Sequence, residues 1–181
     1  MSHTSYENAR ARVQRSELAV PGSSPKMFEK AITSKTRMII INTPHNPSGT
    51  VFSKEDMLQL QALTSGTNII VLSDEVYEHL IYDNEQHQSA CLFSDLKSRS
   101  FITASFGKTF HNTGWKTGYC CAPKDLMDEF IKVHQFNVFS VNHPMQIALA
   151  KYLEDENTYL ELSKFYQKKR DLFLGLMQDS R

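Results

Sequence analysis

Four short apolar runs constrain the fold of this 181-residue chain more than any other feature. They occupy residues 37–41, 68–73, 100–105 and 117–122, and polar or turn-forming residues follow each of them. Runs of this length are typical of buried strands. Strands that alternate with helices favour a largely parallel sheet with helices packed on its faces. We therefore expect an α/β fold, a three-layer sandwich around a mainly parallel sheet.

Helices are predicted both between and after these strands. Ser53 is a candidate N-cap for a helix that ends near Leu63, with acidic residues in its first turn where the helix dipole favours them. Residues 1–25 are polar and lack a pattern, so we expect the folded unit to cover residues 26–181. In the last third of the chain, apolar residues recur at helical spacing, which predicts helices over residues 124–136, 144–153 and 159–177.

Composition narrows the class of function. The chain carries 20 basic and 20 acidic residues, so nucleic acid and anionic membrane surfaces are poor candidate partners. Its apolar runs are too short to cross a bilayer, and residues 1–15 have no apolar signal-peptide core. Three cysteines, two of them adjacent, argue against a disulfide framework and for a reduced, cytoplasmic setting. The histidines show no paired ligand spacing such as HExxH, so no metal site is predicted.

Three polar segments directly follow successive strands. They read NTPHNPSG (residues 42–49), SDEVYEH (residues 73–79) and SFGK (residues 105–108). Ligands of open α/β sheets bind beyond the carboxyl ends of the strands. We therefore expect one shared site there, built from an amide, a carboxylate, a phenol, a hydroxyl and two amines. These belong to Asn46, Asp74, Tyr77, Ser105, Lys108 and Lys116.

Each of these residues taken alone also has a purely structural interpretation. An Asn-Pro-Ser-Gly run is usually just a turn. Asp74 could cap a helix over residues 75–80, and Ser105 could cap the turn that follows it. Lys108 and Lys116 could be solvated surface charges. Their occurrence together, in order and after successive strands, favours the shared site.

These segments, together with SFGKTFHNTGWKTGYC, KVHQFNVFSVNHPMQIALA and YQKKRD, resemble the fold-type-I pyridoxal-phosphate enzymes. Within that aspartate-aminotransferase-like class, they are most similar to the methionine aminotransferase and kynurenine–oxoglutarate transaminase branch. The resemblance runs from about Pro25 to the C-terminus. It implies a pyridoxal 5'-phosphate enzyme that moves an amino group from methionine or an aromatic, kynurenine-like amino acid to a 2-oxo acid. It also implies a homodimer or higher self-association.

The resemblance assigns a role to each candidate residue. Lys108 would hold the cofactor as a Schiff base and later move protons as a free amine, in a desolvated, positively flanked pocket that eases loss of its proton. Asp74 would keep the pyridine nitrogen protonated, which makes the ring an electron sink. The other contacts would be hydrogen bonds to the phenolic oxygen from Asn46 and Tyr77, and to the phosphate from Ser105 and Lys116.

Two departures from the family pattern stand out. Lys116 replaces an arginine found in many relatives, so a point charge rather than a bidentate fork would meet the phosphate. An upstream phosphate-cradling loop and a substrate-binding arginine of a small domain are not visible. Residues 26–181 are thus expected to be the central part of the large domain, ending in the helix that leads to an absent small domain. Two alternatives stay open: a cysteine-conjugate β-lyase on the same fold, and a catalytically incomplete cofactor-binding fragment.

Overall fold

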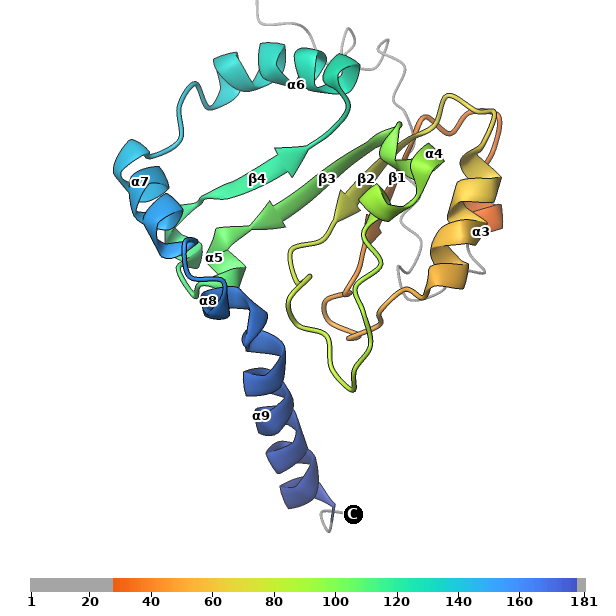
Figure 1. Ribbon diagram of the computed structural model, residues 1–181. Helices are drawn as coiled ribbons and strands as arrows, with labels where there is room; N and C mark the ends of the chain where they lie inside the picture. The colour runs from red at the N-terminus through yellow and green to blue at the C-terminus, as the bar shows by residue number, and fades with distance from the viewer. Residues whose placement is uncertain (1–27, 179–181) are drawn as a thin grey trace, which may run out of the picture.

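A four-stranded sheet lies at the centre of the computed structural model, which describes residues 28–178 (Figure 1). The predicted polar segment 1–25 lies outside this range. Strands β1 (Met38–Asn42), β2 (Ile70–Asp74) and β3 (Ser100–Ser105) run parallel, and β4 (Gly118–Cys121) pairs antiparallel with β3. The predicted strands agree with the observed bounds to within one or two residues. The mainly parallel sheet is confirmed.

The predicted helices are present, with one difference near the C-terminus. The helix predicted over residues 159–177 is divided at Glu161, whose amide hydrogen-bonds within a tight turn to Asn157 and Tyr159. Apolar periodicity did not reveal this break, because Glu161 keeps a right-handed backbone and the pattern continues across it. The helical elements are α2 (Phe28–Ala31), α3 (Lys54–Thr64), η2 (Ala90–Leu92), α4 (Ser94–Lys97), α5 (Phe106–Thr109), η3 (Thr113–Trp115), α6 (Lys124–Asn137), α7 (His143–Tyr152), α8 (Asn157–Leu160) and α9 (Leu162–Met177).

The hydrophobic core lies between the sheet and helices α3 and α4. In β1, Ile39 and Ile41 point into it, whereas Met38 and Ile40 are exposed on the other face. Ser53 caps α3 as predicted, and the side chain of Asp56 completes a capping box by accepting from the Ser53 amide. The core cluster consists of Phe28, Ile39, Ile41, Phe52, Met57, Leu60, Ile69, Val71, Ala90, Phe93 and Leu96.

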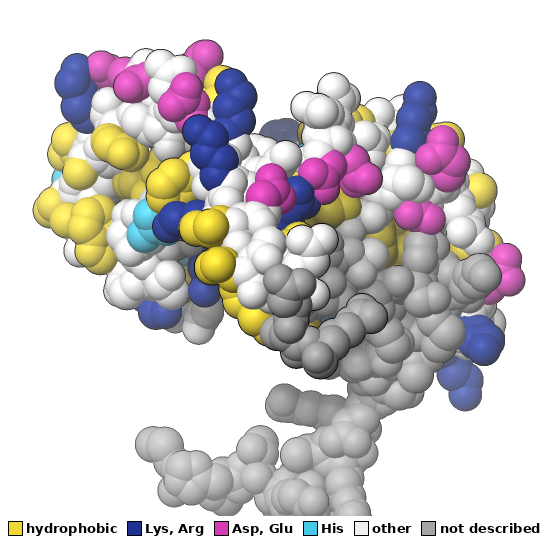
Figure 2. Space-filling model, turned by 90° about the horizontal axis from the view of Figure 1, so that it is seen from below, with side chains coloured by type: hydrophobic (Ala, Val, Ile, Leu, Met, Phe, Trp, Pro, Cys, Tyr) yellow, Lys and Arg dark blue, Asp and Glu magenta, His cyan; other side chains and the backbone are white. Residues whose placement is uncertain are grey.

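The second half of the described chain is packed differently. Helices α6 and α7 lie near β4, and α9 extends away from the sheet (Figure 1). None of the buried core residues except Leu149 comes from these helices, and large apolar side chains such as Phe136 and Phe139 are more than 80% exposed. Groups of hydrophobic side chains are visible at the surface in Figure 2. No helix within residues 28–178 is long and apolar enough to cross a membrane.

Candidate active site

The three polar segments predicted to share a site leave the same edge of the sheet. The strand register places Asn42, at the end of β1, beside Asp74, at the end of β2. Asp74 in turn lies beside Thr103, two residues before the end of β3. Parallel strands end at one edge, so the segments that follow them start side by side.

The first two segments meet through Asn46 and Tyr77. The side-chain amide of Asn46 donates a hydrogen bond of 3.2 Å to the Tyr77 hydroxyl, across 31 residues of sequence. The Asn46 backbone is held in turn, because its N–H donates to Oδ1 of Asn42 at 3.1 Å. The Asn42 amide donates to the carbonyl of Asp74 at 3.0 Å, which links the ends of β1 and β2.

Asp74 is half-buried on the face of the sheet opposite α3. Its Oδ1 accepts a hydrogen bond from the amide of Val76 at 3.2 Å, which shapes the turn that follows. Residues 76–79 form turns and residues 75–80 contain no helix, so the interpretation of Asp74 as a helix cap is wrong. Hydrogen bonds inside this segment span only three residues, from Glu78 to Glu75 and from Leu80 to Tyr77.

The third segment is a tight turn around Gly107. A Cβ atom added to Gly107 would lie 2.9 Å from Cα of Thr113 and 3.2 Å from Oγ of Ser105, so only glycine permits this approach. The Thr113 hydroxyl also donates to the Gly107 carbonyl at 3.1 Å. Ser105 makes no side-chain cap to α5, so the interpretation of this serine as a simple cap is wrong. Its hydroxyl is therefore not used by the helix that follows.

Lys108 lies on α5 and Lys116 directly follows η3, and both are exposed. Within residues 28–178, neither amine takes part in an ion pair or a side-chain hydrogen bond. Lys116 has a left-handed backbone (φ 55°, ψ 41°), a conformation that costs a non-glycine residue about 1–3 kcal/mol and clusters at functional sites. The exposure of Lys108 contradicts the predicted desolvated pocket. Short α5 projects from the sheet edge, and none of the described elements covers its lysine.

Two pockets lie near the candidate residues, and neither contains all six of them. The first, of about 440 Å³, is lined by Asn46 and Tyr77, by residues of the segment up to Glu85, and by Arg170 of α9. The second, of about 560 Å³, lies beside α5 and η3 and is lined by His111, Asn112 and residues of α7 to α9. Asp74, Ser105, Lys108 and Lys116 line neither. Neither of these two pockets brings the candidate residues into one enclosed site.

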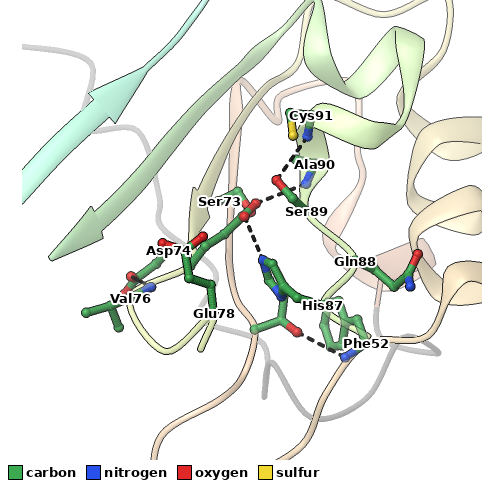
Figure 3. A network of polar contacts seen from close by, with 12 residues as sticks. Phe52, Ser73, Asp74, Val76, Glu78, His87, Gln88, Ser89, Ala90 and Cys91 are labelled. Carbon is green, nitrogen blue, oxygen red and sulfur yellow. Dashed lines mark hydrogen bonds and ion pairs between the residues drawn. The ribbon is translucent and has the colours of Figure 1, made fainter. Parts of the chain in front are cut away.

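Sequence reasoning missed a buried carboxylate next to Asp74. Glu75 is only 1% exposed, and Oε1 accepts hydrogen bonds from the Ser73 hydroxyl at 2.8 Å and the Ala90 amide at 3.0 Å. Its Oε2 lies 2.7 Å from Nε2 of His87. Figure 3 shows Ser73 of β2, His87 of the segment that leads to η2 and Ala90 of η2 lying close together. The period of the strand could have revealed it, because Val71, Ser73 and Glu75 alternate onto the buried face.

Hydrogen bonding keeps Glu75 ionised despite its burial. Burial alone would raise the pKa of this carboxyl group, but the hydrogen bonds from His87 and from the Ala90 amide outweigh it and hold the pKa below its ordinary value of 4.5. A second carboxylate, that of Glu78, accepts a 2.7 Å hydrogen bond from the hydroxyl of Tyr119 on β4. Burial and this bond raise the pKa of Tyr119. The turn after β2 is thus tied to β4 as well.

Comparison with known proteins identifies the family. A family model for aminotransferase class I and II matches residues 12–180. The chain is 45% identical over 155 residues to a methionine aminotransferase of Escherichia coli, covering 85% of this chain and 40% of that protein. It is 41% identical over 150 residues to a kynurenine–oxoglutarate transaminase of Dictyostelium discoideum, covering 80% of this chain and 34% of that protein.

Solved structures agree with this result. The crystal structure of YbdL from Escherichia coli, described as having a methionine aminotransferase function, superposes with a TM-score of 0.82 at 43% identity. It is matched over 85% of this chain and 41% of that one. N-succinyldiaminopimelate aminotransferase from Mycobacterium tuberculosis superposes with a TM-score of 0.80 at 29% identity. The match covers 90% of this chain and 43% of that one. The chain thus spans less than half the length of these relatives. By sequence and by fold, it belongs to the aminotransferase class I and II family.

Proposed function

We propose that the protein of which this chain forms a part is a pyridoxal-phosphate-dependent aminotransferase. It would move an amino group from an amino acid to a 2-oxo acid. The observation that carries the proposal is the position of Lys108. It lies on the short helix directly beyond β3, next to the strand that ends in Asp74, with its amine unpaired within residues 28–178.

The donor set of the sheet edge fits this cofactor. Pyridoxal phosphate presents an aldehyde, a ring nitrogen, a phenolic oxygen and a phosphate, and each has a counterpart among the six candidate residues. The Ser105 hydroxyl is not engaged by the helix after it, and the turn at Gly107 is closed so tightly that a Cβ atom would not fit. When bound, the cofactor would supply a ring that stabilises negative charge at the substrate's α-carbon.

The chain's own residues would then have distinct tasks. Lys108 would hold the cofactor covalently and move a proton at the substrate's α-carbon. Asp74 would keep a proton on the ring nitrogen. The hydrogen-bonded pair of Asn46 and Tyr77 would orient the phenolic oxygen, which the 3.2 Å contact supports. The phosphate would be held by Ser105 and Lys116.

Further parts of the proposal rest on the relatives. Methionine or an aromatic, kynurenine-like amino acid is the proposed donor, because two relatives are named for such substrates. We propose a cytoplasmic homodimer, and the three free cysteines are compatible with a reducing compartment. Residues 26–181 would be the central part of the cofactor-binding domain, with α9 leading toward a second domain. A β-lyase is not favoured, since the relatives named here are aminotransferases.

Covalent labelling tests the proposal directly. The protein is incubated with pyridoxal phosphate, reduced with borohydride, and digested for peptide mass mapping. We expect the pyridoxyl group on Lys108 and no labelling of that peptide in the Lys108→Ala variant. Lys116→Ala is the matched control and should keep the label on Lys108 with weaker binding. Label scattered over several lysines in the wild-type protein would show that the assignment is wrong.

A further inference from the structure

The carboxylate of Glu75 closes a loop of the chain on itself. One of its partners, the Ser73 hydroxyl, belongs to β2. The other two, His87 and Ala90, lie 12 and 15 residues after Glu75 in the sequence. Between them, residues 76–89 leave the sheet edge and return. We call Ser73, Glu75, His87 and Ala90 the Glu75 network. It joins the start and the end of this loop through one buried side chain.

The backbone of Glu75 is held as firmly as its side chain. Its amide donates to the carbonyl of Thr103 on β3 at 2.8 Å, and its carbonyl accepts from the amide of Glu78 at 2.9 Å. Asp74 directly precedes it, and Tyr77 lies two residues after it. The direction in which both side chains leave the backbone therefore depends on where Glu75 is anchored.

A second anchor lies at the tip of the same loop. The guanidinium of Arg170 on α9 binds both carboxylate oxygens of Asp83, at 2.5 and 2.6 Å. The amide of Asp83 also donates to Gln167 at 2.9 Å. These contacts are exposed, whereas the Glu75 network is buried, so the base of the loop is the stronger constraint on residues 74–77.

We propose that Glu75 and His87 are positioning residues that hold the turn from Asp74 to Tyr77 and thereby align the Asp74 carboxylate and the Tyr77 phenol toward one ligand. The identity of that ligand rests on the proposed function; the anchoring of the turn does not. Apolar residues of similar volume often replace a buried charged pair without loss of stability, so stability alone does not account for this network. A fully bonded carboxylate adds directional contacts to three separate groups, which an apolar side chain cannot supply.

Hydrogen–deuterium exchange of the chain without cofactor tests the anchoring. His87→Ala removes the partner of Oε2 and leaves that oxygen of the buried carboxylate unpaired, and we expect exchange of residues 75–82 to rise by about tenfold or more. His87→Gln should stay within about threefold of the wild type, because an amide N–H can replace that of Nε2. Glu85→Gln removes an exposed carboxylate from the same loop and should change nothing. Exchange of α3 serves as the internal reference.

The exchange experiment has clear contrary outcomes. If His87→Ala raises exchange in α3 as much as in residues 75–82, the pair stabilises the fold and has no positioning role. Unchanged exchange in both regions would also overturn the proposal. Should His87→Ala fail to fold, Glu75→Asp takes its place, since a side chain one methylene shorter cannot keep all three contacts. It should then loosen residues 75–82 by a similar factor.

Binding of pyridoxal phosphate, followed by absorbance, tests the consequence for the site. We expect His87→Ala to weaken binding about tenfold and to shift the pH midpoint of the bound cofactor's absorbance band, with His87→Gln close to wild type. A loosened loop with unchanged affinity and pH midpoint would overturn the alignment role. If the wild-type protein binds no pyridoxal phosphate, the proposed function fails, while the exchange result still decides whether Glu75 and His87 anchor the turn.

Discussion

Replacement of Gly118 by alanine probes how the antiparallel strand positions the lysine-bearing turn. Gly118 of β4 pairs with Ser105 of β3, and Ser105 is the residue immediately before α5. A Cβ atom at this position would lie 2.5 Å from the carbonyl oxygen of Ala104 and 3.3 Å from Cα of Ser105. Both obstructing atoms belong to the backbone, so no side chain can move aside and the two strands must separate.

The expected cost follows from this geometry. Forcing extra atoms into a packed position costs about 1–3 kcal/mol, against a gain of about 0.4–1 kcal/mol that alanine gives by restricting the unfolded chain. The middle of these two ranges gives about 1–2 kcal/mol as the fall in the free energy of unfolding that we expect for Gly118→Ala. In a domain of this size, that corresponds to a fall in Tm of about 2–8 °C. Urea unfolding followed by circular dichroism measures the first quantity and a thermal scan the second.

Gly114 provides the matched control in the same β3–β4 connection. A Cβ atom there would meet nothing within 4 Å, and its backbone is not left-handed. Gly114→Ala should therefore leave stability unchanged or raise it by up to about 1 kcal/mol. If the two variants are equally stable, the close approach of β4 to Ala104 does not constrain the turn, and the reasoning is refuted.

Four further expectations concern local structure, charge, catalysis and assembly. Ser53→Ala should lower the free energy of unfolding in urea by about 0.5–2 kcal/mol through loss of the α3 cap, and a smaller change than this range would argue against the capping box. The pKa of Glu75 is depressed in the folded state, so its ionised form contributes stability above about pH 4.5 that is lost as the pH falls through the folded value. Wild type should exceed Glu75→Gln in stability at pH 7, and urea titrations should show the difference shrinking in acid; a constant difference would contradict this. Asp74→Asn should still bind pyridoxal phosphate covalently but slow single turnover by more than about tenfold, or 1.4 kcal/mol of barrier, and a smaller effect would argue against its role. The 181-residue chain should self-associate in size-exclusion chromatography with light scattering, because its α6–α9 half exposes many apolar side chains; a clean monomer would contradict this.

Local patterns in the sequence were sufficient for the four strands and the longer helices, but not for the short helical elements. The short apolar runs of β1 and β2, rich in β-branched residues, identify strands because runs of this length are typical of buried strands. The cap at Ser53 could be recognised because it depends on residues only three positions apart. The break at Glu161 could not, because a tight turn can interrupt a helix without changing its apolar pattern.

The candidate site shows the limit of this reasoning. Order along the chain predicted that three polar segments would leave one edge of the sheet. The strand register agrees, because Asn42 lies beside Asp74 and Asp74 lies beside Thr103. The surroundings of Lys108 were predicted wrongly. Burial of a side chain is decided by which elements pack over it, and none of the described elements covers the Lys108 side chain, although η3 packs closely against Gly107.

Local sequence patterns and the order of segments along the chain therefore determined the strands, the longer helices and the common edge from which the candidate residues project. Only the tertiary structure decided that Asn46 meets Tyr77 across 31 residues and that Glu75 is bound by His87 and Ala90. The physical reason is the range of the interactions. Strand period and helix caps depend on neighbouring residues, whereas a hydrogen bond between distant segments exists only after the sheet has brought those segments together.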